Sequence, residues 1–195
     1  MIFSLNFYKN IFISFRMFPQ PEMITQDQTK AHHSEGFLLS CMDFRIIDDY
    51  EKAMDKLGYN NNYDQFILAG GSLGLTQNKF KYWGQAALDH MDFGKKLHEF
   101  REIIIFDHMD CGAYKKFYPD MKSNEDEYNL HKVNLQHAYS RLSQKFPNLK
   151  YKGMLMNIDG TYEEIELNLD DKSFDEFHTL DEEQAEFLAQ KHFIG

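Results

Sequence analysis

Short apolar runs alternate with helical patterns along the chain. The runs that we predict to be buried strands are residues 37–40, 65–68, 102–106 and 151–158. Helices are predicted over 46–57, 82–100 and 125–145, the first two because their apolar residues recur at three- and four-residue steps. This alternation predicts an α/β fold with a mostly parallel central sheet flanked by helices.

Turn signals mark where several of these elements end or begin. Gly58 follows the first helical pattern and is well placed to end it. Asp159-Gly160 is a hairpin signal that joins the last apolar run to a further strand. Thr179 and Glu182 have the spacing of a capping box, which predicts the start of a last helix.

The 195 residues suit one domain. We predict a single α/β domain over 31–195 and an N-terminal arm over 1–30. The apolar segment 1–18 is interrupted by two basic residues and lacks a small-residue cleavage site, so it predicts neither a signal peptide nor a membrane span. Two interpretations stay open: an arm that packs on its own core or on a partner subunit, or a start assigned too early, with Met17 or Met23 as the first residue.

Charge and cysteine content narrow the possible partners and the compartment. The formal net charge is −10, with 31 acidic and 21 basic residues, which would repel nucleic acid. Neither a nucleic-acid partner nor a membrane partner is therefore expected. Two cysteines make no disulfide framework and favour a reducing, cytoplasmic compartment. A single Cys41–Cys111 disulfide is the alternative.

Residues with metal-binding chemistry follow two of the predicted strands. Cys41 comes directly after the run 37–40, and His108 and Cys111 lie just past the run 102–106. Because sites in open α/β sheets form at the carboxyl ends of the strands, we expect these side chains to meet. Thiolate and imidazole are ligands that zinc prefers. The pattern predicts a Zn²⁺ site with three protein ligands and an open fourth position.

Asp43 and Arg45 follow Cys41 at alternate positions. On an extended backbone all three side chains would project to one side. The carboxylate and the guanidinium would form a bidentate pair, which fixes the carboxylate and keeps it ionised. Asp43 would then orient a nucleophile at the metal, and Arg45 would orient Asp43.

A glycine-rich turn, Gly70-Gly71-Ser72, follows the second predicted strand. It lacks the Gly-x-Gly-x-x-Gly pattern, and no Gly-Lys-Ser/Thr follows it, so it is no nucleotide-binding loop. We expect the glycines to let the backbone pass close to the metal pocket and the turn to offer backbone N–H donors to a substrate.

Other polar residues are interpreted as structural. Asp110, between two predicted ligands, is expected to be exposed or to accept a hydrogen bond near the site. The acidic run 124–127 is expected to be a solvated helix start, and Trp83 to lie in the core or at a dimer interface. Four histidines are expected to be hydrogen-bonded core residues: His90, His98, His131 and His137.

The combination of Cys-x-Asp-x-Arg, a strand with Ala-Gly, and His-x-x-Cys-Gly resembles the β-class carbonic anhydrase family over about 37–168. The resemblance implies three zinc ligands, Cys41, His108 and Cys111. It implies that Asp43 and Arg45 form the family's dyad, and that a zinc-bound hydroxide converts carbon dioxide reversibly to bicarbonate. It also implies a β-carbonic anhydrase-like fold and a homodimer or larger homo-oligomer.

The sequence departs from the family's pattern around the predicted pocket. Leu68-Ala69-Gly70-Gly71-Ser72 stands where many members carry Arg-Asn-Ala-(Ala or Gly)-Asn, and Gly112-Ala113 follows the second cysteine in place of Gly-Gly. Two alternatives therefore stay open. One is a hydrolase of carbon disulfide or carbonyl sulfide on the same site. The other is a non-catalytic zinc protein in which Asp43 closes the fourth position.

Overall fold

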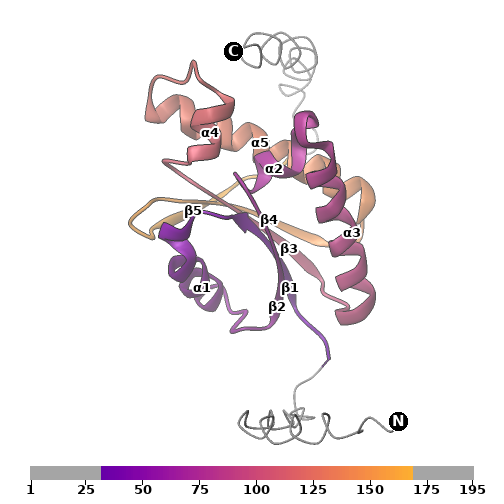
Figure 1. The fold of residues 1–195 in the computed structure, drawn as a ribbon. Coiled ribbons are helices and arrows are strands. Elements are labelled where there is room, and N and C mark those ends of the chain that lie inside the picture. The colour runs from indigo at the N-terminus through magenta and orange to yellow at the C-terminus, as the bar shows by residue number, and fades with distance from the viewer. Residues whose placement is uncertain (1–31, 169–195) are drawn as a thin grey trace, which may run out of the picture. The chain divides into compact units, whose positions relative to one another are not determined.

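The computed structural model describes residues 32–168, which form a five-stranded sheet with helices on both faces (Figure 1). The strands are β1 (Gly36–Cys41), β2 (Tyr63–Leu68), β3 (Glu102–His108), β4 (Lys150–Met156) and β5 (Tyr162–Ile165). Their order in the sheet is β2-β1-β3-β4-β5, and only the β4–β5 pair is antiparallel. The predicted α/β fold with a mostly parallel sheet is confirmed.

The helices divide between the two faces of the sheet. They are α1 (Ile47–Lys56), α2 (Ser72–Thr76), α3 (Lys81–His98), α4 (Gly112–Phe117) and α5 (Asn124–Lys145), with 3₁₀ turns at Phe44–Ile46 and Asn78–Phe80. Figure 1 shows α1 on one face and α2, α3 and α5 on the other. Within 32–168 no helix is both long and apolar enough to cross a bilayer.

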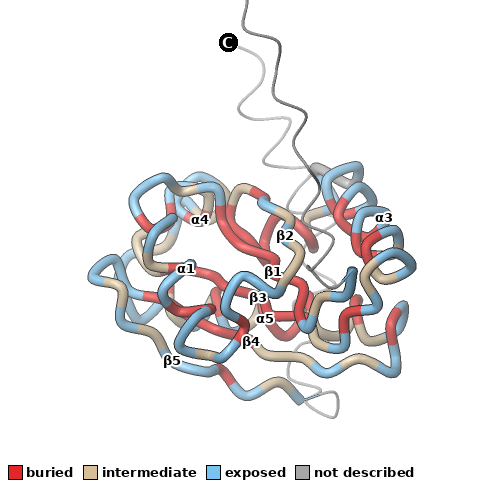
Figure 2. Tube along the Cα trace, turned by 90° about the horizontal axis from the view of Figure 1, so that it is seen from below, coloured by how far each residue is buried: buried red, intermediate tan, exposed pale blue. Residues whose placement is uncertain are grey.

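Alternate side chains of β3 belong to two hydrophobic clusters, one on each face of the sheet. Ile103 and Ile105 pack in a cluster with residues of α3 and α5, whereas Ile104 and Phe106 pack with residues of α1. Successive side chains of a strand point to opposite faces, so a continuous apolar run fits a strand that is covered on both sides. Figure 2 shows the central strands buried and much of the helix surface exposed.

The predicted boundaries agree with the structure to within a few residues at most ends. Gly58 follows α1 with φ +94°, a conformation that glycine adopts without strain. The Asp159-Gly160 turn joins β4 to β5, as expected for a hairpin. The short helix α2 was not predicted, because five residues are too few to show a helical period. The predicted arm over 1–30 and the helix predicted from Thr179 lie outside the described residues.

Candidate metal centre

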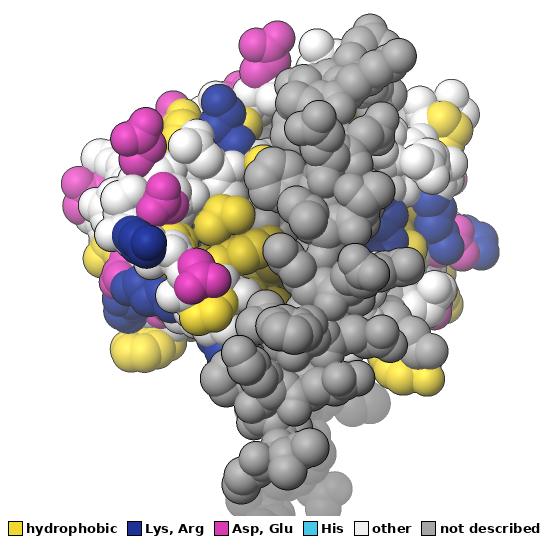
Figure 3. All heavy atoms as spheres, turned by 90° about the horizontal axis from the view of Figure 1, so that it is seen from above, with side chains coloured by type: hydrophobic (Ala, Val, Ile, Leu, Met, Phe, Trp, Pro, Cys, Tyr) yellow, Lys and Arg dark blue, Asp and Glu magenta, His cyan; other side chains and the backbone are white. Residues whose placement is uncertain are grey.

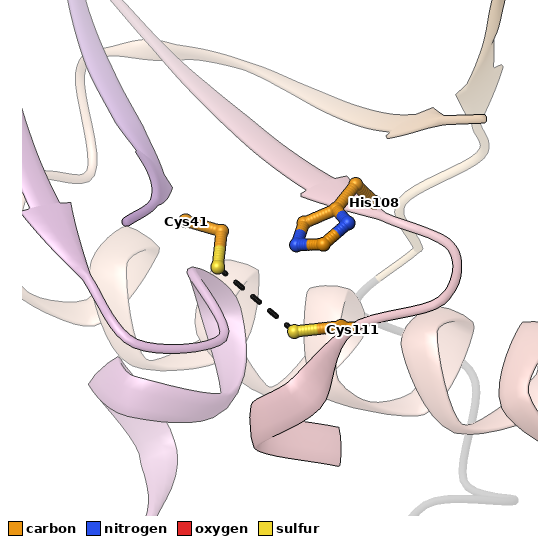
Figure 4. Close-up of side chains that lie close together, drawn as sticks. All are labelled: Cys41, His108 and Cys111. Carbon is orange, nitrogen blue, oxygen red and sulfur yellow. Dashed lines mark hydrogen bonds between the residues drawn. The ribbon is translucent and has the colours of Figure 1, made fainter. Parts of the chain in front are cut away.

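Three side chains meet at the carboxyl edge of the sheet. Cys41 is the last residue of β1, His108 is the last residue of β3, and Cys111 caps the amino end of α4. Because β1 and β3 are neighbours, the two strands bring these distant residues together. One ligand atom from each lies within 4.8 Å of the others, and all three residues are buried. Figure 4 shows the two sulfurs and the imidazole facing one another.

The distance between the two sulfurs distinguishes a metal site from a disulfide. Cys41 Sγ and Cys111 Sγ are 3.9 Å apart, and both thiols are free. A disulfide bond would hold them at roughly 2.05 Å. Two sulfurs that bind one tetrahedral zinc at about 2.3 Å are about 3.8 Å apart. The geometry contradicts the disulfide alternative and fits a shared metal ion.

His108 presents one ring nitrogen to this cluster. Its Nδ1 lies 2.9 Å from the backbone oxygen of Met109 and donates to it. Its Nε2 is buried and has no hydrogen-bond partner among the described residues. A buried, unpaired nitrogen is costly unless something else binds it. Metal-binding histidines commonly donate their other N–H to a carbonyl in this way, so this imidazole fits a metal ligand.

The two thiols shift each other's pKa in opposite directions. The hydrogen bond with Cys111 lowers the pKa of Cys41, assisted by the N–H of Gly70. The same hydrogen bond, together with burial, raises the pKa of Cys111. Burial acts to lower the pKa of His108, but its attraction to the Cys41 thiolate raises it overall. Because thiols bind metal ions as thiolates, a cation bound between the two sulfurs would favour the deprotonated form of both.

Asp43 and Arg45 form the predicted bidentate pair beside the cluster. Arg45 Nη2 donates to Asp43 Oδ2 at 2.7 Å, and Arg45 Nε donates to Asp43 Oδ1 at 3.0 Å. These hydrogen bonds lower the pKa of Asp43 to about 2 and raise that of Arg45. Asp43 Oδ2 is 3.8 Å from His108 Nε2, so the ionised carboxylate lies at the edge of the cluster.

The backbone that carries this pair differs from the prediction. An extended chain was expected from Cys41 to Arg45, but Phe44–Ile46 form a 3₁₀ turn. Asp43 caps this turn, since its Oδ1 also accepts from the backbone N–H of Arg45 at 3.0 Å. The local hydrogen bond between an aspartate and the backbone two residues later favours a turn over a strand. The turn folds Arg45 back onto Asp43.

Asp110 is a second acidic partner of Arg45. Arg45 Nη1 donates to Asp110 Oδ2 at 2.7 Å, and Nη2 donates to the Asp110 backbone oxygen at 2.9 Å. Lys115 also donates to the Asp110 carboxylate. Asp110 is half exposed and lies between His108 and Cys111 with φ +60°. The loop that carries two of the candidate ligands is therefore hydrogen-bonded to the Asp43–Arg45 pair.

The glycine-rich turn lies against the cluster, as expected. The N–H of Gly70 donates to Cys41 Sγ at 3.3 Å, and that of Gly71 donates to the backbone oxygen of Leu68 at 3.2 Å. The N–H of Ser72 donates to Asp107 Oδ1 at 2.8 Å. All three N–H groups thus have partners inside the protein. A role of this turn in substrate binding stays a prediction.

Asp107 and Glu127 are two buried carboxylates whose role the sequence did not reveal. Asp107 is 1% exposed and accepts four hydrogen bonds. Its only sequence signal is a carboxylate inside an apolar strand next to a predicted ligand. Glu127 was expected to be solvated but is 4% exposed, and it accepts from the Cys111 N–H at 2.8 Å. It faces inward because it lies one helical turn before the buried His131.

The histidine predictions have mixed outcomes. His131 is a fully buried core histidine, and its Nδ1 lies 3.0 Å from Asp107 Oδ2. Burial acts to lower the pKa of His131, but its hydrogen bond to Asp107 and the nearby Glu127 carboxylate raise it overall. His98 is half buried and pairs with Asp64 at 2.9 Å. The prediction for His90 is wrong, because this residue is exposed on α3 and its ring packs on Phe66.

A mostly parallel sheet and a buried Cys-His-Cys cluster define an α/β protein whose described residues could hold a metal ion. No protein-family model matches the chain. The chain is 34% identical over 169 residues to the uncharacterized protein RC0076 of Rickettsia conorii, and the match covers 85% of this chain and 91% of that protein. An uncharacterized protein of Rickettsia bellii is 34% identical over 156 residues, covering 76% of this chain and 95% of its own length. The chain belongs to the same family as these Rickettsia proteins.

Solved structures with similar chains include two carbonic anhydrases. One, from Glaciozyma antarctica, is 14% identical with a TM-score of 0.47, and the match covers 71% of this chain and 87% of that chain. A β-carbonic anhydrase from Trichomonas vaginalis is 20% identical with a TM-score of 0.44, covering 70% of this chain and 84% of its own. At these identities the names of the two enzymes describe those proteins alone.

Proposed function

We propose that this protein is a zinc-dependent, carbonic anhydrase-like lyase that catalyses the reversible hydration of carbon dioxide to bicarbonate. Cys41, His108 and Cys111 would be the zinc ligands. The observation that carries the proposal is the meeting of two buried thiols 3.9 Å apart with a buried, unpartnered imidazole nitrogen. The reaction itself is inferred from the resemblance of these residues to the motifs of the β-class carbonic anhydrase family.

Zinc prefers this donor set of two thiols and one imidazole. When bound, zinc would act as a Lewis acid that polarises a water ligand at neutral pH. Three protein ligands leave room for such a ligand, which is the arrangement of catalytic zinc sites. The buried surroundings of the three side chains exclude other water from them and strengthen their interaction with a cation.

The Asp43–Arg45 pair would orient the reacting water. With a pKa of about 2, Asp43 is an ionised acceptor at neutral pH. Two side-chain hydrogen bonds from Arg45, at 2.7 and 3.0 Å, hold the carboxylate at the edge of the cluster. This attachment supports an open site over one that Asp43 closes, because Asp43 would have to leave Arg45 to become a ligand. Asp43 and Arg45 would therefore act as the catalytic dyad.

Stopped-flow measurement of carbon dioxide hydration tests the proposal. The zinc-loaded wild-type protein should hydrate carbon dioxide well above background, and Cys111→Ala should not. Asp64→Asn is the matched control. Asp64 pairs with His98 near the start of β2, whereas Cys41 and His108 lie at the ends of β1 and β3. Equal background rates for wild-type and Cys111→Ala protein would contradict the activity. Sulfide release from carbon disulfide or carbonyl sulfide, without hydration, would favour the hydrolase alternative.

We also propose that the chain works as a homodimer or larger homo-oligomer in the cytoplasm, with residues 31–195 as a single zinc-binding domain and residues 1–30 as an N-terminal arm that would pack on a partner subunit. Hydrophobic side chains reach the surface among charged ones (Figure 3). The exposed ones include Met42, Phe44 and Ile67. Ile67 lies on β2, which is at the edge of the sheet among the described residues. Such a strand is a common place for two chains to pair.

A further inference from the structure

Asp107 is a buried carboxylate on which three separate helices converge. Its Oδ1 accepts from the Ser72 N–H at 2.8 Å, and its Oδ2 accepts from the Ser72 hydroxyl at 2.5 Å. Oδ2 also accepts from the Tyr114 hydroxyl at 2.7 Å and from His131 Nδ1 at 3.0 Å. Asp107 and these three partners are each at most 2% exposed. The carboxylate therefore joins β3 to α2, α4 and α5 in the interior.

One branch of this network leads to Cys41. Ser72 begins α2 directly after Gly70 and Gly71, and the Gly70 N–H donates to Cys41 Sγ at 3.3 Å. Gly71 has φ +54°, and a Cβ at this position would lie 2.5 Å from Asp107 Oδ1. The turn is fitted against the carboxylate so closely that only glycine is accommodated. Asp107 thus fixes the turn whose N–H supports the first thiol.

A second branch leads to Cys111. His131 donates to Asp107 through Nδ1, while its Nε2 lies 3.8 Å from Glu127 Oε1. Glu127 Oε1 accepts from the Cys111 N–H at 2.8 Å. Tyr114 adds a second connection, since it belongs to α4, whose amino end Cys111 caps. The position of the second thiol therefore depends on two partners of Asp107.

The third candidate ligand is joined covalently, because His108 follows Asp107 in β3. Each candidate ligand is thus linked to the same buried carboxylate, Cys111 through three successive contacts and Cys41 through the Gly70–Ser72 turn. A buried carboxylate with four donors is stabilised only while its partners keep their places, since leaving any polar group unpaired costs free energy. Replacing Asp107 would release the turn beside Cys41 and the helices beside Cys111 together.

We infer that Asp107 is the positioning residue of the metal centre, which sets the spacing of Cys41, His108 and Cys111 through the Gly70–Ser72 turn and the His131–Glu127 pair. This inference rests on the metal binding in the proposed function. Residues that hydrogen-bond to metal ligands and orient them typically affect metal affinity by about 10- to 100-fold. We expect an effect in this range, with the protein still folded.

Cobalt binding to the full-length chain tests this role without depending on activity. Asp107→Asn keeps the volume but places an NH₂ group where an oxygen now accepts from donors. Its Co²⁺ affinity, titrated at the sulfur-to-cobalt absorption band, should fall about 10- to 100-fold, and the band should shift. Ser72→Ala, which removes the hydroxyl donor to Asp107, should show a smaller loss of Co²⁺ affinity. If Asp107→Asn does not fold, Ser72→Ala still tests the role of Asp107.

Asp64→Asn is the matched control for cobalt binding. Asp64 is also a hydrogen-bonded partner of a histidine, with His98 Nδ1 at 2.9 Å, and it lies near the start of β2. It should bind Co²⁺ with wild-type affinity. If Asp107→Asn or Ser72→Ala folds and binds Co²⁺ as tightly as Asp64→Asn, the positioning role is overturned while the metal site stands. If the wild-type protein binds no Co²⁺, the proposed metal site falls and this inference with it.

Discussion

Arg45 has two acidic partners, and they give its guanidinium different roles. It holds Asp43 at the edge of the cluster, and it also binds the loop between His108 and Cys111 through Asp110. Exposed ion pairs contribute little to stability when isolated. Here the pairs share one planar guanidinium whose fork suits two carboxylates at once. The two ion pairs serve mainly to orient Asp43, because this carboxylate cannot turn toward Cys41, His108 and Cys111 without breaking its hydrogen bonds to Arg45.

The ionisation of Asp43 gives a prediction for Arg45→Gln. The Arg45 hydrogen bonds lower the pKa of Asp43 to about 2, against an ordinary value of about 3.9. Removing the guanidinium should raise this pKa toward the ordinary value. The titration is measured from the Asp43 carboxyl resonance by ¹³C NMR. An unchanged midpoint in Arg45→Gln would contradict the assignment of the pair.

The same shift predicts the acid dependence of stability. A carboxyl whose folded pKa is depressed stabilises the fold above its unfolded pKa, and this contribution is lost as the pH falls from about 4 toward about 2. Between about pH 5 and about pH 3, Arg45→Gln should therefore lose less unfolding free energy than wild type. Lys52→Gln, which removes the exposed pair with Asp49, should follow wild type.

At the scale of elements, the turn between β2 and α2 is the most constrained connection. Gly71→Ala would place a methyl group 2.5 Å from Asp107 Oδ1 at a backbone φ of +54°. Gly112→Ala meets nothing within 4 Å and begins α4, where alanine is the better helix former. Gly71→Ala should therefore lower the unfolding midpoint, whereas Gly112→Ala should leave it unchanged or raise it.

Denaturant unfolding of the two glycine variants measures the difference. A strained substitution of this kind costs about 1–3 kcal/mol, and the favourable helix substitution gains up to about 1 kcal/mol. Equal unfolding midpoints for Gly71→Ala and wild type would show that the backbone of the turn can shift to accept a methyl group. The close contact with Asp107 would then not restrict this position to glycine.

The sequence best predicted the helices and strands whose apolar residues follow a regular pattern. The triple isoleucine of β3 and the apolar steps of α1 predicted their elements because covered strands and amphipathic helices require those patterns. The meeting of Cys41 with His108 followed from the carboxyl edge that parallel strands share. Strand order could not be read from these patterns, since pairing depends on contacts between distant residues.

Single polar residues were harder to place. Asp107 and Glu127 are buried, yet a lone carboxylate looks the same in a sequence whether it faces water or a histidine. His90 was placed in the core because apolar neighbours surround it along α3, but the helix turns it outward. Burial of a polar group depends on a partner from another element, and the sequence does not show which elements face one another.

At the scale of the whole molecule, the proposed homo-oligomer predicts the mass of the protein in solution. The wild-type protein should sediment at twice the 23.2 kDa chain mass or more. Ile67→Lys, on the edge strand β2, should shift the protein toward monomer because a buried lysine opposes strand pairing. Ile158→Lys is the control, since Ile158 is also partly exposed but lies in the turn after β4. A monomeric wild-type protein would contradict the proposed assembly.

The central claim is that two thiols and one imidazole hold a single zinc ion, and X-ray absorption at the zinc edge of the purified, full-length protein tests it most directly. The site geometry predicts two sulfur atoms at about 2.3 Å and two nitrogen or oxygen atoms at about 2.0 Å. Cys111→Ser should lose one sulfur from this shell. A shell of nitrogen and oxygen alone, or wild-type protein that binds no zinc, would contradict the account.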